Sequence, residues 1–136
     1  MAVTLKYAHL CDYAGPGNNN KALLIGIFDQ LQPPVGAPLQ MPLAFFAAKL
    51  EASIADGADH AVSIVVRDAD EQPVHTVNIP LVHFNPSGPG RPLGALLVLH
   101  IGGMQFPERG DYTFQIVVDN EGVGEAPLYI VEPPPA

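Results

Sequence analysis

Apolar and polar residues alternate along several segments of the chain with the two-residue period of a β-strand. The clearest alternation runs from Tyr112 to Asp119, and similar patterns cover His60 to Arg67 and Val74 to His83. These patterns predict inward-facing side chains at Tyr112, Phe114, Ile116 and Val118, at Val62, Ile64 and Val66, and at Val77, Ile79 and Leu81.

Three further segments complete the set of well-marked strands. Val3 to Tyr13 alternates so that one face is expected to carry Val3, Leu5, Tyr7 and Cys11. Ala22 to Phe28 and Gly94 to Ile101 are apolar at successive positions, which is typical of strands covered on both faces. Pro127 to Val131 predicts a short last strand.

Met41 to Ala55 fits two periods. Leu43, Leu50 and Ile54 suit a helical stripe, whereas Phe46, Leu50 and Ile54 also alternate as in a strand. We favour a strand because the segments on both sides read as β, and the helix remains the alternative.

Turn-forming residues separate these segments. The chain of 136 residues contains thirteen glycines and fifteen prolines, which cluster at 15–20, 32–38 and 85–92. About eight short strands spaced by such turns predict an all-β fold, an antiparallel β-sandwich of immunoglobulin-like or C2-like type. We expect a single domain over residues 1–132 and an extended proline-rich tail over 133–136.

Four short segments share one further feature: Leu10 to Ala14, Leu24 to Asp29, Phe106 to Phe114, and Pro127 to Val131. Together they resemble a family of uncharacterised bacterial proteins of unknown function. The resemblance implies a compact β-sandwich and transfers no catalytic or ligand-binding residue. Gly110-Asp111-Tyr112 also resembles the tyrosine corner of immunoglobulin-like domains, although the disulfide and core tryptophan of antibody domains are missing.

Charge and composition exclude several classes of function. The formal net charge is −8, which disfavours nucleic-acid binding. No apolar run is long enough to span a membrane, and the N-terminal residues do not form a signal peptide. With a single cysteine and no sign of an oxidising compartment, we expect a cytoplasmic location.

The five histidines do not predict a metal site. His75 and His83 lie eight residues apart in one predicted strand, or ~26 Å at ~3.3 Å per residue, so they cannot share an ion. His9, His60 and His100 have no close histidine or cysteine companion, and the chain contains no His-x-His. We therefore assign no metal, no cofactor and no catalytic residue.

Acidic residues near one turn offer a calcium-binding alternative. If successive strands run antiparallel, loops 15–20, 52–59, 84–93 and 119–126 share one end of the sandwich, and loops 30–40, 68–73 and 102–110 share the other. Asp56 and Asp59 then lie far from the 68–73 turn. The carboxylates that could converge beside it are Asp68, Asp70, Glu71, Glu108 and Asp111, although a polar hairpin turn is the simpler interpretation.

Two other motifs are better explained by structure than by chemistry. Cys11 lies among apolar residues and is expected to be a buried thiol rather than a nucleophile. Arg109-Gly110-Asp111 spells an adhesion tripeptide, but we interpret it as the turn that enters the Tyr112 strand.

The leading functional hypothesis is a non-catalytic protein-interaction or assembly module, with a protein partner or a second copy as its ligand. The alternative is a small-molecule or calcium-binding sandwich with ligands from the loops at one end, and an enzyme with an unrecognised site is the third possibility. Gly94 to Ile101 carries apolar side chains in both directions, so we expect an apolar patch there to be completed by a second copy or another protein. The alternative is that this strand lies at the centre of its sheet with both faces buried within one chain.

Overall fold

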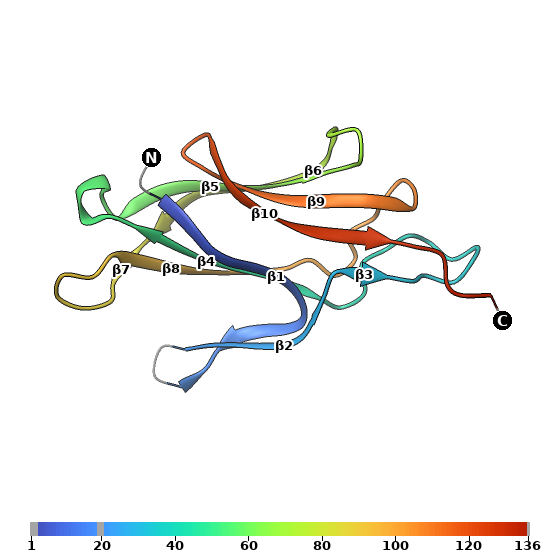
Figure 1. Ribbon diagram of the computed structural model, residues 1–136, viewed down its shortest axis with the longest axis horizontal. Helices are drawn as coiled ribbons and strands as arrows, with labels where there is room; N and C mark the ends of the chain where they lie inside the picture. The colour runs from blue at the N-terminus through green and yellow to red at the C-terminus, as the bar shows by residue number, and fades with distance from the viewer. Residues whose placement is uncertain (1–2, 19–20, 136) are drawn as a thin grey trace.

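The computed structural model describes residues 3–18 and 21–135, which form two five-stranded sheets packed face to face (Figure 1). The first sheet has the order β2-β1-β4-β8-β7. Its strands are β1 (Val3–Pro16), β2 (Ala22–Phe28), β4 (Phe45–Ala52), β7 (Asn85–Pro86) and β8 (Leu93–His100).

The second sheet has the order β3-β10-β9-β5-β6. Its strands are β3 (Gln30–Leu31), β5 (Asp59–Arg67), β6 (Pro73–His83), β9 (Gly110–Val118) and β10 (Glu121–Ile130). Neighbouring strands are antiparallel except for β3, which pairs parallel to β10. A short 3-10 helix, η2 (Ile54–Asp56), follows β4. The prediction of an antiparallel β-sandwich is confirmed.

One apolar core fills the space between the sheets. Phe46 of β4 and Phe114 of β9 are both 0% exposed, and their rings stack with centroids 5.6 Å apart. The inward side chains predicted in 112–119 and 60–67 are all buried, as expected for strands that alternate between core and surface. The domain limits 1–132 and 133–136 remain predictions.

The strand order corresponds to the immunoglobulin arrangement. In that arrangement strands A, B, E and D form one sheet and C, F and G the other, which here are β1, β4, β8 and β7 against β5, β9 and β10. Tyr112, at the start of β9, donates its hydroxyl hydrogen to the carbonyl oxygen of Glu108 over 2.6 Å. The predicted tyrosine corner is confirmed.

The predicted faces of two strands are partly wrong, because a β-bulge in each strand changes which side chains point inward. In β1 the register shifts between Leu5 and Tyr7, so Leu10 faces the main core and Cys11 lies in a separate cluster. Cys11 therefore does not share a face with Val3 and Leu5. A bulge is expected to reverse alternation in this way, because it adds one residue to one strand.

A second bulge displaces Leu81. The pairing of β6 with β5 shifts between His60 and Val62, and Val82 packs against the core. Leu81 was predicted to face inward and is instead 65% exposed.

Met41 to Ala55 contains a strand, as favoured by the pattern, but the strand covers only Phe45–Ala52. Leu43, which the helical stripe would have buried, is 69% exposed, and Ile54, which both patterns would have buried, is 65% exposed. The structure adds two strands that the sequence pattern did not mark, β3 and β7, each two residues long. No helix of the described chain is long and apolar enough to cross a membrane.

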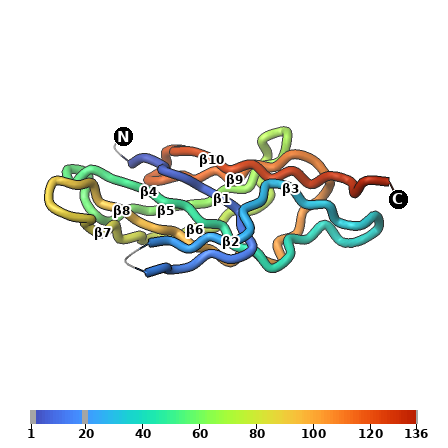
Figure 2. Tube along the Cα trace, turned by 60° about the horizontal axis from the view of Figure 1, so that its bottom comes forward, coloured from blue at the N-terminus to red at the C-terminus, as the bar shows by residue number. Residues whose placement is uncertain are grey.

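Figure 2 shows that the connecting loops gather at two ends, in agreement with the predicted grouping. Contacts within one of these ends support it. The 102–110 loop hydrogen-bonds to the 30–41 segment, where Phe106 donates to Leu39 and Arg109 donates to Pro33. Asn19 and Asn20 of the predicted turn lie outside the described residues.

The tyrosine corner predicts a measurable contribution to stability. Tyr112→Phe should lower the free energy of unfolding by about 0.5–1.5 kcal/mol, because the Glu108 carbonyl loses its hydrogen-bond donor while the ring stays packed. Urea unfolding monitored by circular dichroism measures the change. Tyr129→Phe is the matched control, since Tyr129 is 37% exposed. Equal stabilities for both variants and the wild type would contradict a structural role for the Tyr112 hydroxyl.

Candidate interaction surface

The β1–β2 hairpin packs on the outer face of its own sheet. From Leu10 to Pro16, β1 pairs with β2, and Figure 1 shows this hairpin below the other strands of its sheet. Ala14 and Leu24 from the hairpin contact a cluster that includes Ala47 of β4 and Val98 of β8. One side of the hairpin therefore covers β4 and β8.

The same hairpin leaves large apolar side chains in solvent. Leu23, Ile25 and Ile27 of β2 are 45%, 53% and 56% exposed, and Tyr13, which pairs with Ile25, is 44% exposed. We call these four residues the β2 surface. Isolated apolar residues are common on protein surfaces, but four on one hairpin form a group typical of interaction sites.

The prediction that Ala22 to Phe28 is covered on both sides is therefore wrong. An apolar run predicts coverage only if the strand lies inside a sheet, whereas β2 is the edge strand of its sheet. By contrast, the prediction that Gly94 to Ile101 is covered on both faces agrees with the structure. Ala95 and Leu97 face the main core, and Val98 packs under the hairpin, so the chain itself covers most of β8.

The four sheet edges of the described chain differ in how they are protected. β3 and β7 have two residues each, and Pro33 and Pro34 follow soon after β3. β6 contains Pro73 and Pro80 and is interrupted by bulges. β2 has seven residues with neither proline nor charge, and its one irregularity is Gly26, with a φ of 67°. Soluble proteins usually protect edges with proline, charge or short length, and β2 has the least such protection.

The clearest polar cluster joins two loops at the opposite end from the 68–73 turn. His60 is 5% exposed, and its Nδ1 lies 2.6 Å from Asp119 Oδ2 while its Nε2 lies 3.0 Å from the Gly57 carbonyl oxygen. Because both neighbours accept hydrogen bonds, the doubly protonated ring satisfies both. Asp119 also accepts from the Ala61 backbone N–H over 3.0 Å.

Each partner shifts the pKa of the other. The hydrogen bond to Asp119 is the main cause that raises the pKa of His60, against the opposing effect of burial. The same hydrogen bond holds the pKa of Asp119 below its usual range. The His60 ring also packs against Phe84, with ring centroids 4.8 Å apart. This cluster fixes the η2 loop to the β9–β10 turn.

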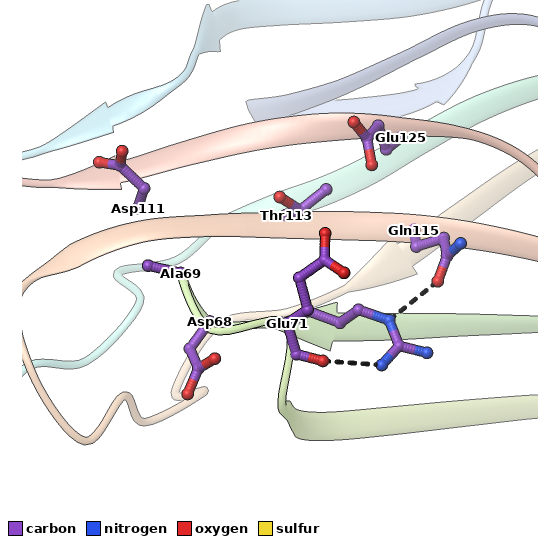
Figure 3. Close-up of a pocket in the computed structure, with 8 residues that line it drawn as sticks. Asp68, Ala69, Glu71, Asp111, Thr113, Gln115 and Glu125 are labelled. Atoms are coloured by element: carbon purple, nitrogen blue, oxygen red, sulfur yellow. Dashed lines mark hydrogen bonds between the residues drawn. The ribbon is translucent and has the colours of Figure 1, made fainter.

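The predicted acidic cluster does not assemble a cation site. Asp68, Glu71 and Asp111 line a hollow of about 310 Å³, whereas Asp70 and Glu108 do not. Figure 3 shows the carboxylates spread around the hollow. Arg67 donates hydrogen bonds to the side-chain oxygen of Gln115 and to the carbonyl oxygen of Glu71. No three acidic, histidine or cysteine side chains of the described residues are placed to hold a metal ion.

The remaining candidate residues have structural contacts. Cys11 is 0% exposed, as predicted, and burial raises the pKa of its thiol. Arg109 of the Arg-Gly-Asp motif donates to the carbonyl oxygens of Val131, Pro33 and Pro34, which agrees with its interpretation as part of a turn. His75 bonds to the Gln105 carbonyl, and His83 bonds to Asp59, so these two histidines have separate partners.

Residues 6–131 match the model of a protein family described as a family of unknown function, DUF6941. The chain belongs to this family. The resemblance predicted from the four short segments is thereby confirmed. No curated protein matches the sequence significantly.

Solved structures show similarity in fold to this DUF6941 protein. An alkylpurine DNA glycosylase from Pseudomonas fluorescens, bound to DNA with an abasic-site analog, aligns with a TM-score of 0.54 and 11% identity over 96% of this chain. The aligned region covers 30% of the glycosylase chain. An immunoglobulin-like protein from Pseudomonas aeruginosa aligns with a TM-score of 0.45 and 10% identity, over 96% of this chain and 98% of the other.

The His60–Asp119 pair predicts a specific dependence of stability on pH. Because the folded-state pKa of His60 is raised above 6.5, its contribution is complete below about pH 6.5 and is lost as pH rises through the folded pKa. Because the pKa of Asp119 is lowered from 3.8, its contribution is present above about pH 4 and is lost as pH falls through the lowered pKa. Urea unfolding between about pH 4 and pH 9 should therefore show stability decreasing on the alkaline side.

His60→Gln should remove most of that alkaline decrease. His83→Gln is the control, because the His83 side chain is 62% exposed and its ion pair with Asp59 is solvated. If the His60 variant and the wild type lose stability in parallel above about pH 6.5, the pair does not carry the dependence.

Proposed function

We propose that this protein is a non-catalytic, cytoplasmic interaction module that binds a protein partner through the β2 surface. The observation that carries the proposal is the exposure of Leu23, Ile25 and Ile27 on an edge strand that has no charge or proline. Burial of such side chains against a partner is favourable by roughly 25 cal/mol per Å² of apolar area removed from water.

The arrangement of the polar residues supports an interaction role over catalysis. The buried or motif-forming groups His60, Arg109 and Cys11 are engaged in contacts that hold loops or strands together. A catalytic group would be expected to point a free polar atom into a cleft that could receive a substrate.

Charge supports a protein partner over a nucleic acid. The glycosylase is similar in fold alone, and the net charge of −8 on this chain opposes approach to a phosphate backbone. An uncharged apolar strand is instead suited to contact with another apolar protein surface.

Substitution at the β2 surface tests this proposal. Tagged wild type, Ile25→Lys and Leu81→Lys are expressed in the source organism beside an untagged copy, cross-linked in cells, and compared by quantitative mass spectrometry. Leu81 is the matched control, because it is an exposed apolar residue of the other sheet. Partners held by the β2 surface should fall by about tenfold or more with Ile25→Lys, since burying an unpaired charge costs more than 1.4 kcal/mol.

The same partners should remain with Leu81→Lys. Identical sets of cross-linked proteins for all three forms would contradict the proposed role of β2. Circular dichroism of each purified form establishes that folding is unchanged.

A further inference from the structure

The charges around β2 have an internal symmetry. The strand runs from Ala22 to Phe28 without a charged residue, Lys21 precedes it, and Asp29 follows it. Both flanking residues are exposed, and among the described residues neither forms an ion pair. Ile25 lies midway between them, four residues from each.

This symmetry makes the strand complementary to a reversed copy of itself. When a second β2 lies antiparallel with Ile25 opposite Ile25, Lys21 of each copy meets Asp29 of the other. Leu23 of each copy then lies opposite Ile27 of the other, so that the exposed apolar residues of both copies meet. A twofold contact requires such self-complementarity, because each residue must suit its counterpart.

We infer that the partner of the β2 surface is a second copy of this chain, bound antiparallel about a twofold axis near Ile25. This inference rests on the proposed function of β2 and specifies its partner. In this register Lys21 and Asp29 form two attractive contacts between the copies. In a parallel arrangement each of them would instead lie opposite a residue of the same charge.

The rest of the molecule confines the association to this strand. Each copy has a net charge of −8, so two copies repel each other over most of their surfaces. The uncharged strand β2, bordered by one positive and one negative residue, lacks this repulsion. The other edges are short or carry proline, as described above. Gly26, beside the axis, has a φ of 67°, a backbone conformation that glycine adopts without a steric penalty.

A symmetric cross-link tests the register. Across an antiparallel contact, residues directly opposite each other have Cα atoms about 4.5–5.5 Å apart, within the range that a disulfide spans. Ile25→Cys should therefore form a covalent dimer under mild oxidation about tenfold faster than the control Leu81→Cys at equal concentration. The native Cys11 is 0% exposed and does not compete.

Charge reversal tests the flanking pairs independently. Sedimentation velocity from about 1 to about 200 μM should show that Lys21→Asp and Asp29→Lys each weaken dimerisation by about 2- to 30-fold, because each substitution removes both exposed ion pairs of the dimer. The double variant Lys21→Asp/Asp29→Lys should restore the wild-type affinity, because it exchanges the two ends of both pairs.

The outcomes separate the second-copy inference from the proposed function. A wild-type dimer that Ile25→Lys abolishes and the double variant retains supports both. A wild type that stays monomeric to about 200 μM, while Ile25→Lys still loses another protein in cells, overturns the second copy and leaves β2 as an interaction surface. A monomeric wild type whose cellular partners are unchanged by Ile25→Lys overturns both.

Discussion

The stacked pair Phe46–Phe114 is the contact on which the two-sheet architecture depends. β4 and β9, which carry these residues, are each the middle strand of a five-stranded sheet, so the pair joins the sheets at their centres. Antibody domains join the corresponding strands with a disulfide, whose second cysteine lies two residues after the corner tyrosine. Phe114 occupies that position after Tyr112, and a chain with one cysteine achieves the connection with aromatic packing.

The ends of the sandwich are then fixed by polar contacts. At one end Tyr112 and Arg109 bind backbone carbonyls of the 102–110 loop, the 32–34 segment and the end of β10. At the other end His60 joins the η2 loop to the β9–β10 turn through Asp119. These contacts engage the buried side chains of Tyr112 and His60. The β1–β2 hairpin differs from both ends because three large apolar side chains of one strand, β2, are exposed there.

The local sequence pattern predicts much of this fold, because the alternation of buried and exposed side chains along a strand does not depend on which strands lie beside it. Tyr112 to Val118 and Val62 to Val66 follow their predicted faces, and Gly110-Asp111-Tyr112 predicts the corner. The errors arise where one residue changes the register, as in β1 near Lys6 and in β6 near Leu81. Exposure of Leu23 and Ile25 could not be predicted, because an apolar run is the same in sequence whether its strand is central or at an edge.

The polar cluster was missed for a different reason. His60 and Asp119 are 59 residues apart, and neither has a distinctive local motif. The predicted grouping of loops 52–59 and 119–126 at one end was the signal that could have joined them. The β2 surface could be identified only from the structure, because that step compares the protection of four edge strands that are distant in sequence.

Hydrogen–deuterium exchange of the β2 amides tests the central claim, that this edge is buried against a second copy, most directly. The exchange rates of residues 22–28 are measured by mass spectrometry at about 5 and about 200 μM, with the β6 amides as an internal reference. The account predicts that β2 exchange slows by several-fold at the higher concentration while β6 exchange stays constant. Rates in β2 that do not depend on protein concentration would contradict it.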